Sequence, residues 1–196
     1  MSEMTGSIYG SNLDRMTDIM NTFMSRIEDA RKKIEVKTGM DPVEHCLCRI
    51  KSEESMREKC RRNSLPENEH SALIEIHDAI GIRVVCAFVD DVYSMRDHIT
   101  TFDGIKIFEE KDYIKSAKPN GYRSYHMILK TDDGFFVEVQ LRTVSMDTWA
   151  SLEHHMKYKK NISGNEELIS KELKRCADEL ASTDVSMQAI RNLINS

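Results

Sequence analysis

Acidic and amide side chains alternate with apolar residues along a segment that is typical of a β-strand, residues 135–142. Because successive side chains of a strand point to opposite faces, Glu138, Gln140 and Arg142 share one face. Three consecutive polar side chains do not enter a dry core without partners. The face is therefore either the solvent side of a sheet or the floor of a site in which Glu138 binds a metal ion or acts as a base.

A second carboxylate, Asp78, lies just before residues 81–89, whose β-branched side chains predict a buried strand. A magnesium ion that handles phosphates takes one or two protein carboxylates and leaves its other positions to water and substrate oxygens. Asp78 and Glu138 together would meet that need if their strands are neighbours. Taken alone, Asp78 is equally well explained as a turn residue at the end of a strand.

A basic segment could hold phosphate groups. Residues 49–62 contain six basic and three acidic side chains. Lys51, Ser55 and Lys59 are spaced by four, which predicts that they line one face of a helix beginning after Ser52. Ammonium groups near a helix N-terminus suit a triphosphate. The alternative is a solvated surface helix whose lysines pair with neighbouring glutamates.

An aromatic and basic segment runs from Lys118 to His126. Its Asn-Gly step marks a turn, and the alternation that follows places Tyr122, Ser124 and His126 on one face of a strand. An aromatic ring at the edge of a phosphate site can stack on a nucleobase, which contributes about 1–3 kcal/mol per base. The alternative is that the tyrosines are ordinary cross-strand aromatics.

The rest of the pattern predicts the elements that position these residues. Apolar side chains at spacings of three and four from Leu13 to Ile34 predict an amphipathic helix that ends near Gly39. The elements expected after it are a helix at 53–62, a strand at 81–89, a helix at 91–100, a short strand at 105–108, a hairpin of strands at 122–131 and 135–142, and helices from 145 onward with a break near 163–164.

These elements predict an α/β (α+β) fold with a mixed sheet, because the hairpin requires at least one antiparallel pair. The expected organisation is an N-terminal helical extension at 1–40, a core at 41–160 and a C-terminal helical extension at 161–196.

Composition limits the classes of partner. The net charge of −5 gives no general attraction to DNA or to an anionic membrane. No apolar run reaches the roughly 20 residues of a membrane span. Residues 1–12 lack the basic and apolar segments of a signal peptide, so the cytoplasm is the expected compartment. RNA binding stays open.

The five cysteines are odd in number and irregularly spaced, which argues against a disulfide framework. Cys46, Cys48 and Cys60 lie near His45, but no second ligand pair follows at the spacing of a zinc site. Buried or incidental thiols are the better interpretation.

Together and in this order, these segments resemble the synthetase domain of the RelA/SpoT family, and specifically its short stand-alone members. The resemblance covers residues 49 to about 158. The matching motifs are Arg49-Ile50-Lys51 with Ser55, Glu58-Lys59 and Arg61-Arg62; His77 to Arg83 (HDAIGIR); Phe88-Val89-Asp90-Asp91; Asp112-Tyr113-Ile114; Lys118 with Gly121 to His126 (GYRSYH); Glu138 to Thr143 (EVQLRT); and Trp149-Ala150 with Glu153-His154.

The resemblance implies a nucleotidyltransferase-like fold and a magnesium-dependent GTP pyrophosphokinase. Such an enzyme transfers pyrophosphate from ATP to the 3′-hydroxyl of GTP or GDP, which gives the stringent-response alarmone (p)ppGpp and AMP. The acceptor is left open among GTP, GDP and GMP.

The resemblance also implies roles for individual residues. Asp78 and Glu138 would bind Mg²⁺, and Glu138 would also deprotonate or orient the 3′-hydroxyl. The ATP-binding residues would be Arg49, Lys51, Ser55, Lys59, Arg62 and Arg83, with the adenine between the two arginines Arg49 and Arg83. The residues near GTP or GDP would be Lys111, Lys118, Tyr122, His126 and Gln140, with Tyr122 stacked on the guanine.

Three positions depart from the family pattern. Stand-alone members often have an aromatic and a hydroxyl residue ahead of the basic helix and an asparagine after the EVQLRT-type motif, where this chain has His45, Leu47 and Asp147. In some members that region forms an intersubunit alarmone-binding pocket, so the resemblance does not imply such regulation here. The flanking helices resemble those through which such enzymes form tetramers, which predicts a homotetramer.

Two other functions compete with this interpretation. His77-Asp78 and His154-His155 could belong to a metal phosphohydrolase of the HD type, which would need several such ligands converging from helices. The other alternative is a non-catalytic regulator that binds a nucleotide or RNA on the same fold. Retention of both Asp78 and Glu138 argues against the regulator.

Overall fold

The computed structural model describes residues 6–158 and 165–194. Its centre is a five-stranded sheet in the order β1 (Val43–Ile50), β2 (Ile80–Cys86), β5 (Phe136–Thr143), β4 (Tyr125–Thr131), β3 (Ile105–Asp112). β2 and β5 are parallel, and every other neighbouring pair is antiparallel. The predicted α/β class with a mixed sheet is confirmed.

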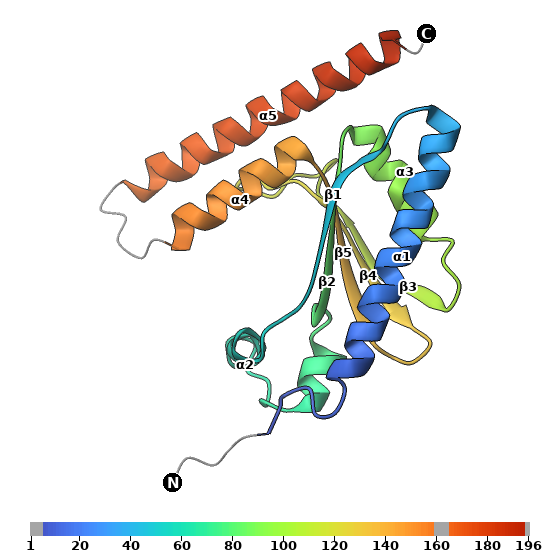
Figure 1. Cartoon of the computed structure of the whole chain (residues 1–196). Helices are drawn as coiled ribbons and strands as arrows, with labels where there is room; N and C mark the ends of the chain where they lie inside the picture. The colour runs from blue at the N-terminus through green and yellow to red at the C-terminus, as the bar shows by residue number, and fades with distance from the viewer. Residues whose placement is uncertain (1–5, 159–164, 195–196) are drawn as a thin grey trace.

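One face of the sheet is covered by α1 (Leu13–Thr38) and α3 (Val89–Ile99), which lie side by side in Figure 1. The apolar seam predicted for α1 is buried from Met16 to Ile34, whereas its predicted first residue, Leu13, is exposed. The seam packs on the inward residues of the central strands, such as Ile82 and Val139, in a single core. Each such fully buried side chain contributes about 1.5–3 kcal/mol. The opposite face of the sheet is thereby left for polar residues.

Two helices follow the sheet. α4 (Val144–Tyr158) continues directly from β5, and α5 (Glu166–Ile194) runs back along it (Figure 1). The Trp149 indole donates to the Leu173 carbonyl at 2.8 Å, and the Thr143 hydroxyl lies 2.6 Å from the Asp184 carboxylate. α5 is therefore fixed to both α4 and the end of β5.

The basic segment forms α2 (Glu53–Arg62), and a single π-helical turn, η1 (Ser71–Glu75), packs beside it. Ser52 is the N-cap, as predicted, and its hydroxyl accepts from the Ser55 backbone N–H at 3.3 Å. α2 lies beyond one end of the sheet in Figure 1, so its basic side chains can reach the uncovered face only from that end.

Both edge strands differ from the prediction. β1 was not predicted at all, and β3 is eight residues long where only 105–108 was expected. In the other direction, β2 ends at Cys86 and not Val89, because the Asp91 carboxylate accepts from the Phe88 N–H at 3.2 Å and α3 begins there. β4 begins at Tyr125, three residues later than predicted.

The boundaries predicted near residues 40 and 160 stay a prediction, although α1 shares the core of the sheet. Within the described parts of the chain, no helix has both the length and the apolar run that crossing a bilayer would take. All five cysteines are free thiols.

Candidate active site

The uncovered face of the sheet brings six of the predicted site residues into two transverse rows. Strand register sets both rows. The first runs from β3 to β2 through Lys111, His126, Gln140 and Arg83. The second contains Glu138, Gly81 and Arg49. Residues that the sequence separates by as much as ninety positions are therefore neighbours on one surface.

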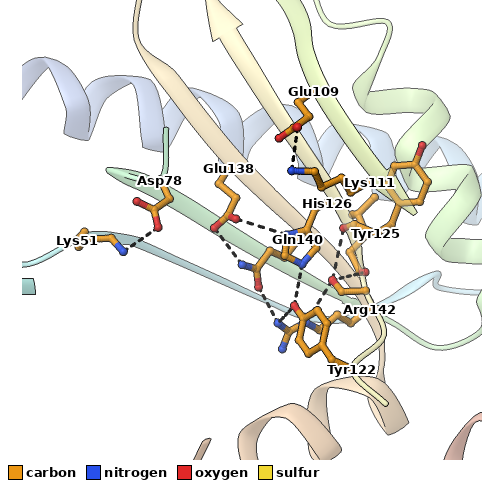
Figure 2. A network of polar contacts seen from close by, with 12 residues as sticks. Lys51, Asp78, Glu109, Lys111, Tyr122, Tyr125, His126, Glu138, Gln140 and Arg142 are labelled. Carbon is orange, nitrogen blue, oxygen red and sulfur yellow. Dashed lines mark hydrogen bonds and ion pairs between the residues drawn. The ribbon is translucent and has the colours of Figure 1, made fainter. Parts of the chain in front are cut away.

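Five side chains on this face form a closed ring of polar contacts, shown in Figure 2. The Gln140 amide donates to Glu138 Oε2 at 3.0 Å, and Arg142 Nη2 donates to Gln140 Oε1 at 2.8 Å. Arg142 Nη2 also donates to the Tyr122 hydroxyl at 2.6 Å, and that hydroxyl lies 2.7 Å from His126 Nε2. His126 Nδ1 closes the ring at 3.5 Å from Glu138 Oε1. The ring fixes the Glu138 carboxylate relative to the tyrosine.

The Glu138 carboxylate is mostly buried yet ionised. Burial acts to raise the pKa of Glu138, and the charge of Asp78 acts the same way. The hydrogen bond and charge of His126, with the Gln140 amide, outweigh both effects and hold the pKa below its usual range. At neutral pH the group is therefore an anion that can accept a proton or bind a cation.

Asp78 lies in the turn before β2 and is held by two lysines. Its Oδ2 is 2.8 Å from Lys51 Nζ and 2.5 Å from Lys59 Nζ. Burial acts to raise the pKa of Asp78, but the two ammonium groups outweigh it and lower that pKa. Among the described residues, Asp78 Oδ1 is buried with no hydrogen-bond partner. The unpaired oxygen is an available ligand atom, since a buried lone pair without a partner is costly.

The predicted position of Lys51 on the helix is wrong. Lys51 precedes the N-cap Ser52, and its backbone N–H donates to the Ala79 carbonyl at 2.9 Å. That bond continues the pairing of β1 with β2 and positions Lys51 beside Asp78. The two lysines therefore converge as expected, but from a strand end and a helix. Ser55 and Arg62 are exposed in the first and last turns of α2.

The two carboxylates fit a magnesium ion. Glu138 pairs with Gly81, three residues after Asp78, so both acids lie at the same end of the parallel pair. In the described part of the chain, no group of three or more His, Cys, Asp or Glu side chains could hold a metal. A cation here would have at most these two carboxylates, with water and substrate oxygens completing its shell, and Mg²⁺ is typically bound in that way. The ligand groups that an HD-type phosphohydrolase requires are also absent from these residues.

A pocket over β1, β2 and β5 has Arg49 and Arg83 in its wall, with Glu138 and Gln140 beside them. Gly81 lies between Arg49 and Glu138 in the register and contributes no side chain, so the pocket stays open there. Burial lowers the pKa of Arg83, and the nearby charge of Arg142 acts in the same direction. Arg83 Nε is buried without a hydrogen-bond partner among the described residues. The pocket thus presents cationic groups to an incoming ligand.

Aromatic rings and lysines gather on the other side of Glu138. Lys118 Nζ lies 4.9 Å from the centre of the Tyr122 ring and 4.5 Å from that of Tyr113. Lys111 is exposed in the neighbouring strand, where it pairs with Glu109 at 2.8 Å. A half-buried ring flanked by cations suits a nucleobase with attached phosphates.

The loop that carries Tyr122 rests on α5. Arg123 Nη2 lies 3.0 Å from the Asp178 carboxylate, and Arg123 Nη1 donates to the Ala177 carbonyl at 3.4 Å. Gly121 has a positive φ of 93°, and a Cβ there would lie 2.7 Å from the Ala177 Cβ. Only glycine allows the loop to approach the helix so closely.

Alanine at Gly121 is expected to lower the free energy of unfolding and to weaken binding of the acceptor nucleotide that the motif resemblance implies. The left-handed backbone alone costs about 1–3 kcal/mol, and the clash with Ala177 would push the loop and Tyr122 off α5. Gly134→Ala is the matched control, since its φ is 87° and no described atom lies within 4 Å of the new Cβ. Denaturant unfolding should show a lower free energy of unfolding in both variants, whereas only Gly121→Ala should raise the KM for the guanine nucleotide that the motif resemblance implies. Equal KM values in the two variants would contradict this account.

Sequence reasoning missed two residues of the site. Arg142 was placed on the polar face by alternation but received no role, although its guanidinium is the branch point of the ring. Asp147 was noted only as a departure from a family pattern, yet it lies 3.0 Å from Arg142 Nη1. The signal for Arg142 was its position on the same face as Glu138. Asp147 had no such signal, because its contacts with Arg142 and Arg83 depend on how the first turn of α4 packs against β5 and β2.

A model of the region found in RelA/SpoT proteins matches residues 48–163. The chain belongs to the RelA/SpoT family. Among its relatives, GTP pyrophosphokinase YwaC of Bacillus subtilis (strain 168) is 36% identical over 164 residues, which cover 80% of this chain and 78% of YwaC. GTP pyrophosphokinase YjbM of the same strain is 33% identical over 174 residues, which cover 85% of this chain and 80% of YjbM.

Solved structures of the RelA/SpoT family agree with this fold over nearly its whole length. Small alarmone synthetase 1 from B. subtilis, bound to its product pppGpp, superposes with a TM-score of 0.79 at 28% identity, covering 92% of this chain and 95% of that one. Small alarmone synthetase 2 from B. subtilis gives a TM-score of 0.80 at 31% identity, with 93% and 98% covered. The family resemblance drawn from the motifs is confirmed, and the solved structures that cover most of the chain are small alarmone synthetases.

Proposed function

We propose that this RelA/SpoT family member is a GTP pyrophosphokinase that makes (p)ppGpp from ATP and GTP or GDP. The observation that carries the proposal is the position of Glu138. It is an ionised carboxylate with the lysine-held Asp78 on one side and the ring of His126 and Tyr122 on the other. The relatives named GTP pyrophosphokinase and the neighbour bound to pppGpp support the same reaction.

In this reaction Glu138 takes the proton of the acceptor 3′-hydroxyl. The freed oxygen attacks the β-phosphorus of ATP, and the bond from that phosphorus to the α-phosphate oxygen breaks. AMP leaves with the electron pair, and the pyrophosphoryl group stays on the 3′-oxygen. A positioned base of this kind contributes about 10²–10⁴-fold. The hydrogen bond from Gln140 keeps the carboxylate oriented while it acts.

Mg²⁺ is the proposed cofactor, and Asp78 and Glu138 would hold it. When bound, the ion would neutralise charge on the phosphoryl oxygens. Lys51 and Lys59 would release Asp78 and bind the ATP phosphates. Ser55 and Arg62, both from α2, would contribute to the same phosphate site. Arg49 and Arg83 would hold the adenine.

On the acceptor side, Tyr122 would stack on the guanine. His126 and Gln140 would lie near the ribose, and Lys111 and Lys118 near the phosphates. Because the ring ties Tyr122 and His126 to Glu138, a guanosine placed on the tyrosine would present its ribose to the base.

The proposed assembly is a homotetramer. α5 exposes large apolar side chains, including Val185 at 68%, Leu193 at 76% and Ile194 at 76%. Apolar side chains repeated along an exposed helix are typical of a surface that another copy covers. The proposed compartment is the cytoplasm, where free thiols persist and nucleotide substrates are present.

A nucleotide turnover assay tests the proposal. The protein is incubated with ATP and magnesium together with GTP, GDP or GMP, and the products are separated by chromatography. We expect one AMP for each 3′-pyrophosphorylated guanosine nucleotide, and loss of both products when EDTA removes the metal. Nucleotide binding without any such product, over all three acceptors, would favour the non-catalytic regulator instead.

A further inference from the structure

Two arginines from opposite halves of the site meet on one carboxylate oxygen. Asp147 lies in the first turn of α4, and its Oδ1 is 3.0 Å from Arg142 Nη1 and 3.2 Å from Arg83 Nη1. The Asp147 side chain is only 14% exposed. Its other oxygen, Oδ2, lies 4.0 Å from His45 Nε2. The carboxylate thus lies among three basic side chains, at the end of the active-site face where β5 continues into α4.

The two arginines have different tasks. Arg142 Nη2 donates to the Tyr122 hydroxyl, on the acceptor side. Arg83 lines the pocket over β1, β2 and β5, on the donor side. Contact through Asp147 is therefore a direct link between the two halves of the site.

The link depends on charge as well as on shape. Two guanidinium groups repel one another when little water separates them, and their repulsion is part of the lowered pKa of Arg83. The negative charge of Asp147 opposes that effect. An amide of the same size could still accept a hydrogen bond, but it would not neutralise either arginine. Without the charge, we expect Arg83 to turn away, because it is the more exposed of the two, at 33% against 5%.

We propose that Asp147 is a positioning residue that joins the two nucleotide subsites by holding Arg83 and Arg142 on one oxygen. This inference rests on the proposed function for the identity of the two nucleotides. Asp147 acts through the two arginines. Its role is to hold Arg83, in the wall of the ATP pocket, at a fixed position relative to Arg142 and the ring of polar contacts that includes Tyr122.

Asp147→Asn is expected to raise the KM for ATP and the KM for the guanine nucleotide together, each by about tenfold, as the loss of one charge-assisted hydrogen bond would do. The effect on kcat should be smaller, because Glu138 keeps its contacts with Gln140 and His126. A role confined to folding would instead lower the amount of active enzyme and leave both KM values unchanged.

The route through each arginine is tested by a second variant. In an Arg83→Gln background, Asp147→Asn should have no further effect on the KM for ATP but should still raise the KM for the acceptor. Asp91→Asn is the structural control, since it breaks a buried ion pair with Arg191, 2.6 Å in length, between α3 and α5. That control should lower the melting temperature without a change in either KM.

The outcomes separate the two proposals. If the wild-type protein makes no guanosine product, the proposed function fails, and calorimetric binding of ATP to the wild type and to Asp147→Asn still tests the donor-side contact. If the wild type is active, the inference is overturned when Asp147→Asn leaves either KM within twofold of the wild-type value. It is also overturned when the ATP effect persists in the Arg83→Gln background.

Discussion

Replacing Glu138 with glutamine is expected to lower kcat by about 10²–10⁴-fold, the usual contribution of a positioned base. The amide has nearly the same shape and can still accept the hydrogen bond from Gln140, which is 3.0 Å long in the wild type. It cannot take the 3′-hydroxyl proton, and it is a weaker metal ligand. ATP affinity measured by calorimetry should change little, because the lysines proposed to hold the ATP phosphates contact Asp78 and not Glu138.

Glu28→Gln is a suitable control for this variant. Glu28 is a half-exposed carboxylate on α1, which covers the opposite face of the sheet, so its substitution should leave kcat within twofold. Retention of more than a tenth of wild-type kcat by Glu138→Gln would mean that another group takes the proton.

The second large effect is expected from Asp78→Asn, which should lower turnover but raise the affinity for ATP in the absence of metal. Turnover with magnesium should fall by about 100-fold or more, since one of the two carboxylates proposed to bind the ion is lost. Affinity for ATP in EDTA should rise. In the wild type, Lys51 and Lys59 both hold Asp78 Oδ2, so a metal-free triphosphate must compete with that carboxylate for them. A neutral amide would hold the two lysines less tightly, so ATP would compete with it more easily.

Calorimetric titration with ATP in EDTA measures the expected rise in ATP affinity directly. Lys59→Gln provides the comparison, because it should weaken ATP binding with and without metal. If Asp78→Asn also weakens metal-free ATP binding, then the carboxylate serves to position the lysines for the triphosphate, and the proposed competition is wrong.

The sequence predicted the central strands well and the edge strands poorly, for a physical reason. β2 and β5 are hydrogen-bonded on both sides and mostly buried, so apolar and β-branched residues mark them strongly in the sequence. β1 is paired only with β2, and most of its side chains are exposed. Polar β3 is likewise an edge, with a bulge between Ile107 and Glu109. A strand that need not bury its side chains leaves little trace in hydrophobic periodicity.

The site was predictable where one element determines it. Alternation along β5 correctly grouped Glu138, Gln140 and Arg142 on one face, and Asp78 lies just before β2, as expected. The contacts between elements were not predictable in this way. The bond that brings Lys51 to Asp78 belongs to a strand that was not expected, and the meeting of Arg83 with Asp147 needs the packing of α4 on the sheet.

The parallel pair at the centre of the sheet also bears on how the protein folds. β4 can pair with β3 and with β5 as near neighbours in the chain, whereas pairing Ile80 with Val137 requires closure of a long loop. Contacts of that kind are entropically costly and form slowly. Asp78 and Glu138 approach one another only when this closure is complete. We therefore expect a nascent or partly folded chain to be unable to consume ATP and GTP. Catalysis should begin only once β2 has paired with β5.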